Sequence, residues 1–339
     1  MNSGGETIMK KNKFNIMGKP WFSIFVALII LCVISSFLMP AFLQLGNFRG
    51  ILTAASTSGV MAVGLTFVIM TGGIDISIGG IVYLTAIIYC VSAVKLENVA
   101  IAVVLTIGAA AIAGGLNGYL VDKFQMAPMI TTLATLNVYK GIGLLVSNGQ
   151  SFTVPRNATF WGKGNVGGVP IPIIILIISA LIGSYLFSRT RFGTYTRAIG
   201  NSAASAAESH LPVRMTMIKA YLLAGFTAGI AGIIYVSRAG GLQGNLGNGI
   251  EFTVIAAVVL GGTKLIGGAG TIAGSIMGAI FLVIIDNILT MLGASTYAFE
   301  AVRGIILIFA VAADRGAYVR QFNAMRKEKY DRIRETSKH

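Results

Sequence analysis

The chain has 339 residues, of which 55% are hydrophobic and only 11% are charged, and its formal net charge is +14. A soluble domain normally has about 25% charged residues, so this composition excludes a soluble protein and indicates an integral membrane protein. The basic residues cluster between and after apolar stretches, where membrane topology selects them, so the net charge is not evidence for nucleic-acid binding.

The first 20 residues are basic and precede an apolar run, as in a signal peptide. They hold Lys10, Lys11, Lys13 and Lys19, but no small-residue cleavage site follows and many further apolar stretches do. We therefore expect a cytoplasmic N-terminus at 1–20 and a retained first helix.

A helix needs about 20 apolar residues to cross the hydrocarbon core. This rule predicts an all-α, polytopic bundle of transmembrane helices with about ten spans. The eighth candidate is short, and glycines join the second and third, so the expected count is eight to ten. The candidate spans are 21–39, 51–70, 78–94, 99–121, 128–146, 170–187, 218–236, 252–263, 271–292 and 297–313.

The distribution of Lys and Arg predicts the orientation of the bundle. If the N-terminus is cytoplasmic, the cytoplasmic segments hold 19 of the 26 basic residues, which is the bias of a bacterial inner-membrane protein. The stretch 189–219 alone carries Arg189, Arg191, Arg197, Arg214 and Lys219. With ten spans the tail 315–339 is cytoplasmic as well, and we interpret its charges as a solvated end attracted to anionic lipid.

The segment 147–169 is rich in Gly, Asn and Ser and is expected to be an extracytoplasmic loop, with Phe160 and Trp161 at the membrane interface. Cys32 and Cys90 lie inside apolar stretches and are interpreted as packing residues. His210 is interpreted as a surface residue.

Two glycine-rich segments interrupt the apolar pattern. MTGGIDISIGG (70–80) places Asp75 and Ser77 between two spans, and VLGGTKLIGGAG (259–270) does the same with Thr263 and Lys264. Broken helices at membrane depth are tolerated where protein or a water-filled path satisfies the backbone, and paired breaks point to a transport pathway. Asp75 or Ser77 could instead cap the helix that begins near Ile78, and the two roles can coexist.

Other polar residues lie within predicted spans. Asp286 is a pathway candidate, and Asn287 is added to that set, although Asn117, Asn137 and Asn287 could equally hydrogen-bond neighbouring helices. Glu300 and Arg303 stand three residues apart, so we expect them to form an ion pair on one helix. The predicted pathway residues are thus Asp75, Ser77, Lys264, Asp286 and Asn287.

Neither glycine-rich segment is a nucleotide site, because no P-loop string occurs in the chain. The sequence also has no nucleophile motif and no cluster of His, Cys or carboxylates at ligand spacing. We expect no catalytic residues, no metal and no cofactor, so that energy from ATP would come from a partner.

Three motifs resemble those of one known family. FVIMTGGIDISIGG (67–80), RTRFGTYTRAIGNSAASAAESHLPV (189–213) and VVLGGTKLIGGAGTIAGSIMGA (258–279) are similar to the permease subunits of ribose-type ABC importers, and the likeness spans nearly all of 21–314. The resemblance implies a transmembrane permease domain at 21–314 that moves a monosaccharide. It also implies a second permease subunit, a cytosolic ATPase with two nucleotide-binding domains, and an extracytoplasmic binding protein.

By the same resemblance, the loop 189–219 carries the coupling helix that docks on the ATPase. The departures from the family pattern are Asn201 and Ser202 for a Gly-Asn pair, Glu208 for an apolar residue and His210 for a glycine. The residues expected to couple to the ATPase are Arg197, Ala198, Gly200, Asn201, Ala204, Glu208, Pro212 and Arg214.

The hypothesis is alternating access driven by the partner ATPase. The same machine could carry a nucleoside, a branched-chain amino acid or a sugar-derived signal. A rival of another class is an ion-coupled secondary transporter, in which Asp75, Asp286 or Glu300 would carry the ion. A membrane-embedded enzyme is the weakest alternative.

Overall fold

The computed structural model describes residues 21–242, 247–295, 297–312 and 315–316. The expected N-terminal segment 1–20 and all but the first two residues of the tail 315–339 lie outside these ranges. In the described residues the chain is an all-α bundle, which confirms the fold class predicted from the apolar spans.

Seven helices in the described ranges are long and apolar enough to cross a membrane. They are α2 (Leu45–Met70), α3 (Ile78–Lys95), α4 (Val99–Lys123), α5 (Pro128–Ser147), α7 (Ile171–Arg189), α10 (Val213–Ala239) and α12 (Ile272–Met291). Two shorter apolar helices, α1 (Phe22–Leu38) and α11 (Ile250–Leu260), and a helical stretch at 297–312 account for the other three predicted spans.

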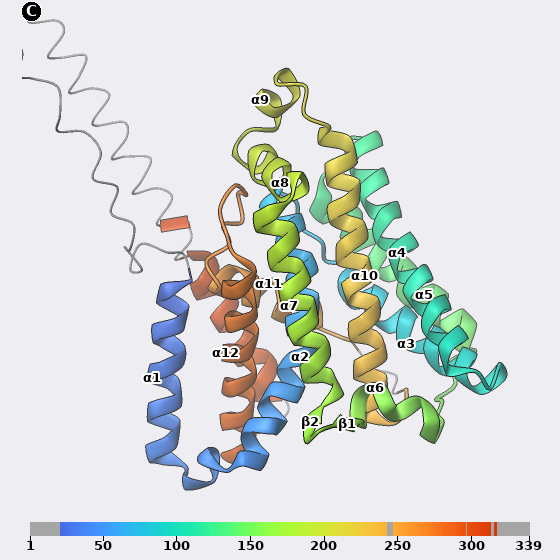
Figure 1. The fold of residues 1–339 in the computed structure, drawn as a ribbon, viewed down its shortest axis with the longest axis vertical. Coiled ribbons are helices and arrows are strands. Elements are labelled where there is room, and N and C mark those ends of the chain that lie inside the picture. Colours follow the sequence, from blue (N-terminus) through green and yellow to red (C-terminus); the bar gives the residue numbers. More distant parts are fainter. Residues whose placement is uncertain (1–20, 243–246, 296, 313–314, 317–339) are drawn as a thin grey trace, which may run out of the picture.

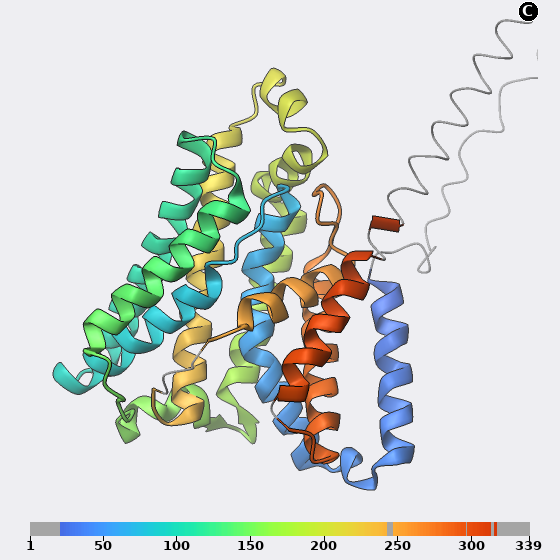
Figure 2. The same ribbon diagram turned by 180° about the vertical axis from the view of Figure 1, so that it is seen from behind.

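The predicted span 252–263 is not a complete helical crossing. At 1.5 Å per residue, the 11 residues of α11 rise about 16 Å, roughly half of the hydrocarbon core. After α11 the chain is non-helical through 261–271 (Figures 1 and 2). The chain is likewise non-helical at 71–77, so both predicted interruptions are confirmed.

The bundle has two distinct ends (Figure 1). One carries α8 (Arg191–Asn201) and α9 (Ala203–Glu208) and is called the α8 end here. The other, the α6 end, carries the short elements of the loops: η2 (Pro40–Leu43), η3 (Arg156–Thr159), α6 (Phe160–Lys163) and the antiparallel hairpin of β1 (Asn165–Val166) and β2 (Val169–Pro170).

The centre of the bundle is α2, which is buried over most of its length, with α10 packed on both α2 and α4. Small residues allow the close approach: a methyl group added to Gly114 of α4 would lie 2.8 Å from Cα of Gly225 of α10. A methyl group added to Gly64 of α2 would likewise lie 2.8 Å from Cα of Ala224 of α10. Glycine at these crossings is thus required by packing, as in other membrane bundles.

The segment 147–169 is more ordered than a simple loop. The hydroxyl groups of Tyr89 and Ser237 both donate to the carbonyl oxygen of Ala158, at 2.7 and 3.2 Å, and so tie η3 to α3 and α10. The rings of Phe160 and Trp161 lie edge to face, 5.6 Å apart, at the start of α6. The segment 147–169 is therefore fixed to the helices at the α6 end of the bundle.

Candidate functional site

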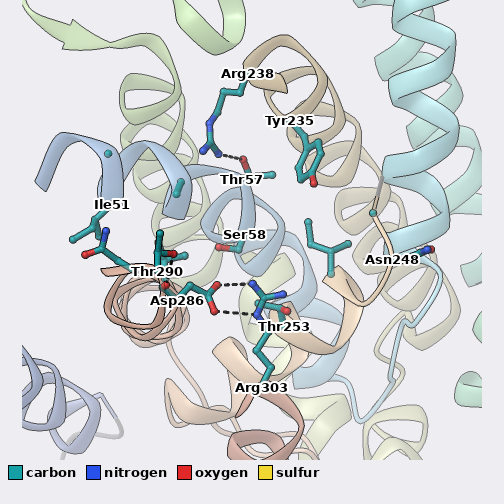
Figure 3. A pocket seen from close by; sticks show the side chains of 16 residues that line it. Ile51, Thr57, Ser58, Tyr235, Arg238, Asn248, Thr253, Asp286, Thr290 and Arg303 are labelled. Carbon is teal, nitrogen blue, oxygen red and sulfur yellow. Dashed lines mark hydrogen bonds and ion pairs between the residues drawn. The ribbon is translucent and has the colours of Figure 1, made fainter. Parts of the chain in front are cut away.

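A polar pocket of about 350 Å³ opens in the α6-end half of the bundle, between α2, α10, α11 and α12 (Figure 3). Its size is that of a small-molecule site. Its polar side chains are Thr57 and Ser58 of α2, Tyr235 and Arg238 of α10, Asn248 and Thr253 at α11, Asp286, Asn287 and Thr290 of α12, and Arg303. Hydroxyl, amide and charged groups from five segments therefore converge on one space.

The strongest interaction in this pocket joins Asp286 to Arg303. The guanidinium donates from Nη2 to Oδ2 at 2.6 Å and from Nε to Oδ1 at 3.2 Å, with side chains 19% and 32% exposed for Asp286 and Arg303. The predicted ion pair of Arg303 with Glu300 is wrong. Arg303 pairs instead with Asp286 of α12, because both carboxylate oxygens of Asp286 accept hydrogen bonds from the guanidinium group. Because each charge already has its partner, the pair can line a pocket inside a membrane.

Asn287 both lines the pocket and joins two helices. Its Nδ2 donates to Oδ1 of Asn47 at 2.8 Å, and Nδ2 of Asn47 donates back to Oδ1 of Asn287 at 3.2 Å. This reciprocal amide pair fixes α12 against the first turn of α2. Asn287 therefore does hydrogen-bond a neighbouring helix, as the alternative interpretation of the asparagines predicted.

Arg238 is a pocket residue that the sequence reasoning missed. It is half-buried in the last turn of α10, and its Nη1 points at the hydroxyl oxygen of Thr57, 3.5 Å away (Figure 3). Two features of the sequence could have indicated this pocket residue. An arginine stands at the end of one apolar span, and a run of small and hydroxyl residues at 53–58 lies inside another. Such runs pack helices closely and can also face a polar cavity.

Asp75 and Ser77 lie elsewhere, in a fully buried network beside α4 and α5. Oδ1 of Asp75 accepts from the backbone N and the hydroxyl of Ser77 at 2.9 and 2.6 Å. Nδ2 of Asn117 donates to the Ser77 hydroxyl at 2.6 Å, and the Tyr139 hydroxyl donates to Oδ1 of Asn117 at 2.9 Å. Asp75 thus organises the start of α3 without lining the pocket, and a pathway role for it and for Ser77 stays a prediction.

Lys264 lies in the second interruption, 261–271, at the α8 end and away from the pocket. This segment meets the first interruption directly, because Gly268 N donates to the carbonyl oxygen of Met70 at 3.0 Å. Of the five predicted pathway residues, the structure therefore brings Asp286 and Asn287 into one pocket and leaves Asp75, Ser77 and Lys264 outside it.

The predicted coupling residues fall into an inner and an outer group. On the inner side, Arg197 donates to the carbonyl oxygens of Gly193 and Phe187 at 3.2 and 3.3 Å, while Gly200 packs against Met70 and Gly268. Ala198 is half-buried on the same helix. The outer group is exposed on and around α9 and consists of Asn201, Ala204, Glu208, Pro212 and Arg214.

One outer residue, Arg214, and the nearby His210 have intramolecular roles that the sequence did not specify. Nε of Arg214 lies 3.1 Å from Oδ2 of Asp122 and joins α10 to α4. His210 has a φ of 57°, and α9 ends there with Leu211 N donating to Ala206 O and His210 N to Ala207 O. This hydrogen-bond pattern is a Schellman motif, which favours glycine at the position that His210 occupies.

The chain matches proteins of known class over most of its length. The model of the family described as "Branched-chain amino acid transport system / permease component" matches residues 47–311. The ribose import permease protein RbsC of Bacillus subtilis (strain 168) is 37% identical over 294 residues, which are 86% of this chain and 91% of that protein. The L-arabinose transport system permease protein AraH of Escherichia coli (strain K12) is 32% identical over 308 residues, which are 90% of this chain and 94% of that protein. No solved structure gives a significant match.

Proposed function

Because the chain belongs to the family of permease components of the branched-chain amino acid transport system, we propose that it is the multi-pass, inner-membrane permease of an ATP-driven importer whose cargo is a monosaccharide. The observation that carries the choice of cargo is the polar pocket. Among the similar proteins, those of Bacillus subtilis and Escherichia coli are named for ribose and L-arabinose.

The pocket suits a small polyol. A sugar loses its water only where donors and acceptors replace it, and Thr57, Asn248 and Thr290 offer both kinds of group. Tyr235 adds a ring for the apolar face of a sugar. A free amino acid would require one unpaired charge of each sign, whereas the carboxylate in this pocket, Asp286, is already engaged by Arg303.

The orientation follows from the basic residues. With the α8 end in the cytosol, the cytoplasmic segments hold 19 of the 26 Lys and Arg residues, including the stretch 189–219. Both termini are then cytoplasmic, and the pocket lies toward the outer face. A binding protein would deliver cargo at the α6 end.

The α8 end is the surface on which a separate ATPase with two nucleotide-binding domains would act. Its exposed residues on α9, Ala204 and Glu208, form the contact, and Gly200 passes the displacement to Met70 and Gly268, where the two interruptions meet. The chain would work beside a second permease subunit, identical or paralogous, and would itself hydrolyse no ATP. We assign the permease domain to residues 21–314, with basic segments at 1–20 and 315–339 on either side of it.

The test is reconstitution in liposomes with the ATPase and the binding protein, followed by ATP-driven uptake of labelled ribose and L-arabinose. Thr57→Val and Asn248→Leu remove pocket polarity and should reduce uptake at least tenfold, while Asn137→Ala, on the exposed face of α5, should leave it unchanged. Uptake by the purified chain alone, driven by a proton or sodium gradient, would instead establish a secondary transporter. Full activity of both pocket variants would remove the pocket from the pathway.

A further inference from the structure

An apolar groove lies between α7 and α10, with α2 beneath it. It consists of two cavities of about 270 and 180 Å³ that share Ile175 and Ile230. The larger is lined by α7 and α10 with Val63 of α2 as its floor, and its polar side chains are Ser179 and Thr227. The smaller continues toward Trp161 at the α6 end. In Figure 1 the ribbons of α7 and α10, the two helices that line the larger cavity, are neighbours in the view.

The groove is too apolar to hold ordered water. An apolar cavity of about 150 Å³ in an engineered protein stays dry and takes up benzene, and this groove exceeds it. Thr227 adds no demand for water, because its hydroxyl donates to the carbonyl oxygen of Ala224 at 3.0 Å. Hydrocarbon is therefore the material that fits the space.

Two cations continue the lining of the groove at its α8 end. On α10, Lys219 stands four residues before the lining residue Leu223; on α7, Arg189 stands three residues after the lining residue Leu186. Residues three and four apart share one face of a helix, so both cations lie on the faces that form the groove. Both residues are exposed. Neither α7 nor α10 contains an Asp or Glu that could neutralise them.

We propose that this groove is a binding site for an anionic phospholipid of the leaflet at the α8 end. One acyl chain lies in the groove between α7 and α10, and the phosphate lies between Arg189 and Lys219. The arginine supplies a planar fork for two phosphate oxygens and the lysine a point charge. The lipid would join two helices that share α2, α6 and α8 as neighbours, and it would brace α7 where it leads into α8.

The occupant could instead be an apolar helix of a second copy of this chain. Such a helix would need the groove but not the cations, and the positions of Arg189 and Lys219 at the α8 end of the groove favour the lipid. The two occupants make different predictions, because lipid binding depends on headgroup charge and dimer formation through an apolar helix does not.

The experiment uses the full chain purified in neutral detergent, with phosphatidylglycerol or phosphatidylcholine of identical acyl chains added. Native mass spectrometry should show retained phosphatidylglycerol, and the thermal midpoint should rise with that lipid alone. The double variant Arg189→Gln/Lys219→Gln should bind phosphatidylglycerol at least tenfold more weakly. The control Lys95→Gln/Lys123→Gln removes the same charge at other helix ends and should bind normally. Ile182→Trp, which fills the groove, should weaken binding with both cations present.

Three results would overturn the proposal. One is equal binding by the cation variant and its control. Another is the same stabilisation by inorganic phosphate, which would make the acyl chain irrelevant. The third is a lipid-independent dimer that Ile182→Trp dissociates, which would assign the groove to a second copy.

Discussion

The backbone N–H of Gly268 donates to the carbonyl oxygen of Met70 at 3.0 Å, and this bond joins the two segments that interrupt the bundle. Gly200, at the C-terminal end of α8, packs against both residues. A displacement of α8 therefore reaches the end of α2 and the segment 261–271 without passing through any other element.

Gly200→Ala should uncouple ATP hydrolysis from transport. An added methyl group would collide with the carbonyl oxygen of Met70 and the backbone N of Gly268, and overpacking of this kind typically costs about 1–3 kcal/mol. The measurement is the ratio of labelled sugar transported to ATP hydrolysed in reconstituted complexes, which should fall at least tenfold. Gly108→Ala is the matched control because its methyl group meets open space. An unchanged ratio in Gly200→Ala would show that the junction does not transmit motion.

The Asp286–Arg303 pair should contribute to stability as well as to the pocket. Removing one partner leaves a partly buried charge without its two hydrogen bonds, so Asp286→Asn and Arg303→Gln should each lower the free energy of unfolding by about 2 kcal/mol. A double-mutant cycle followed by thermal unfolding in detergent gives the coupling. The comparison pair is Arg214 with Asp122, where the arginine side chain is 61% exposed and the coupling should stay below about 1 kcal/mol. Equal coupling in the two pairs would contradict this account.

His210→Gly should stabilise α9. The left-handed conformation at φ 57° costs a side-chain-bearing residue about 1 kcal/mol that glycine does not lose. Hydrogen exchange of the amides in 203–211 should slow accordingly. Ser209→Gly is the control, because Ser209 has a φ of −79°, which any residue adopts without strain. Glycine there relieves no backbone strain and raises the conformational entropy of the unfolded chain, so hydrogen exchange should become faster. Slower exchange in both variants would point to a cause other than backbone conformation.

Asn117→Ala should destabilise the start of α3. The substitution leaves the hydroxyl of Ser77 without its donor and removes one of two acceptors of Tyr139, inside a network that is almost entirely buried. The expected loss is about 1–3 kcal/mol, measured by thermal unfolding. Asn137→Ala removes an exposed amide that bonds only to its own helix, at Leu133, and should change stability by less than about 0.5 kcal/mol.

The spans could be predicted from sequence because the length of an apolar run is local information. The partner of Arg303 could not be predicted. Glu300 is three residues away on the same helix, whereas Asp286 lies on α12 and is brought near Arg303 only by the tertiary fold. The same holds for Asp75, whose surroundings depend on Asn117 and Tyr139 of two later helices. Local glycine and charge patterns thus located the two interruptions, and the tertiary contacts decided which polar residues share a pocket.

Gly50 and Gly247 line the pocket with peptide backbone alone, since neither has a side chain. The two positions differ in tolerance: Gly247 has a φ of 80° that resists any other residue, whereas a methyl group on Gly50 would meet nothing within 4 Å. Single substitutions at Gly50 could therefore narrow the cavity at little expense to folding. Selection for a smaller cargo therefore has an open route at Gly50, whereas no substitution at that position can widen the cavity.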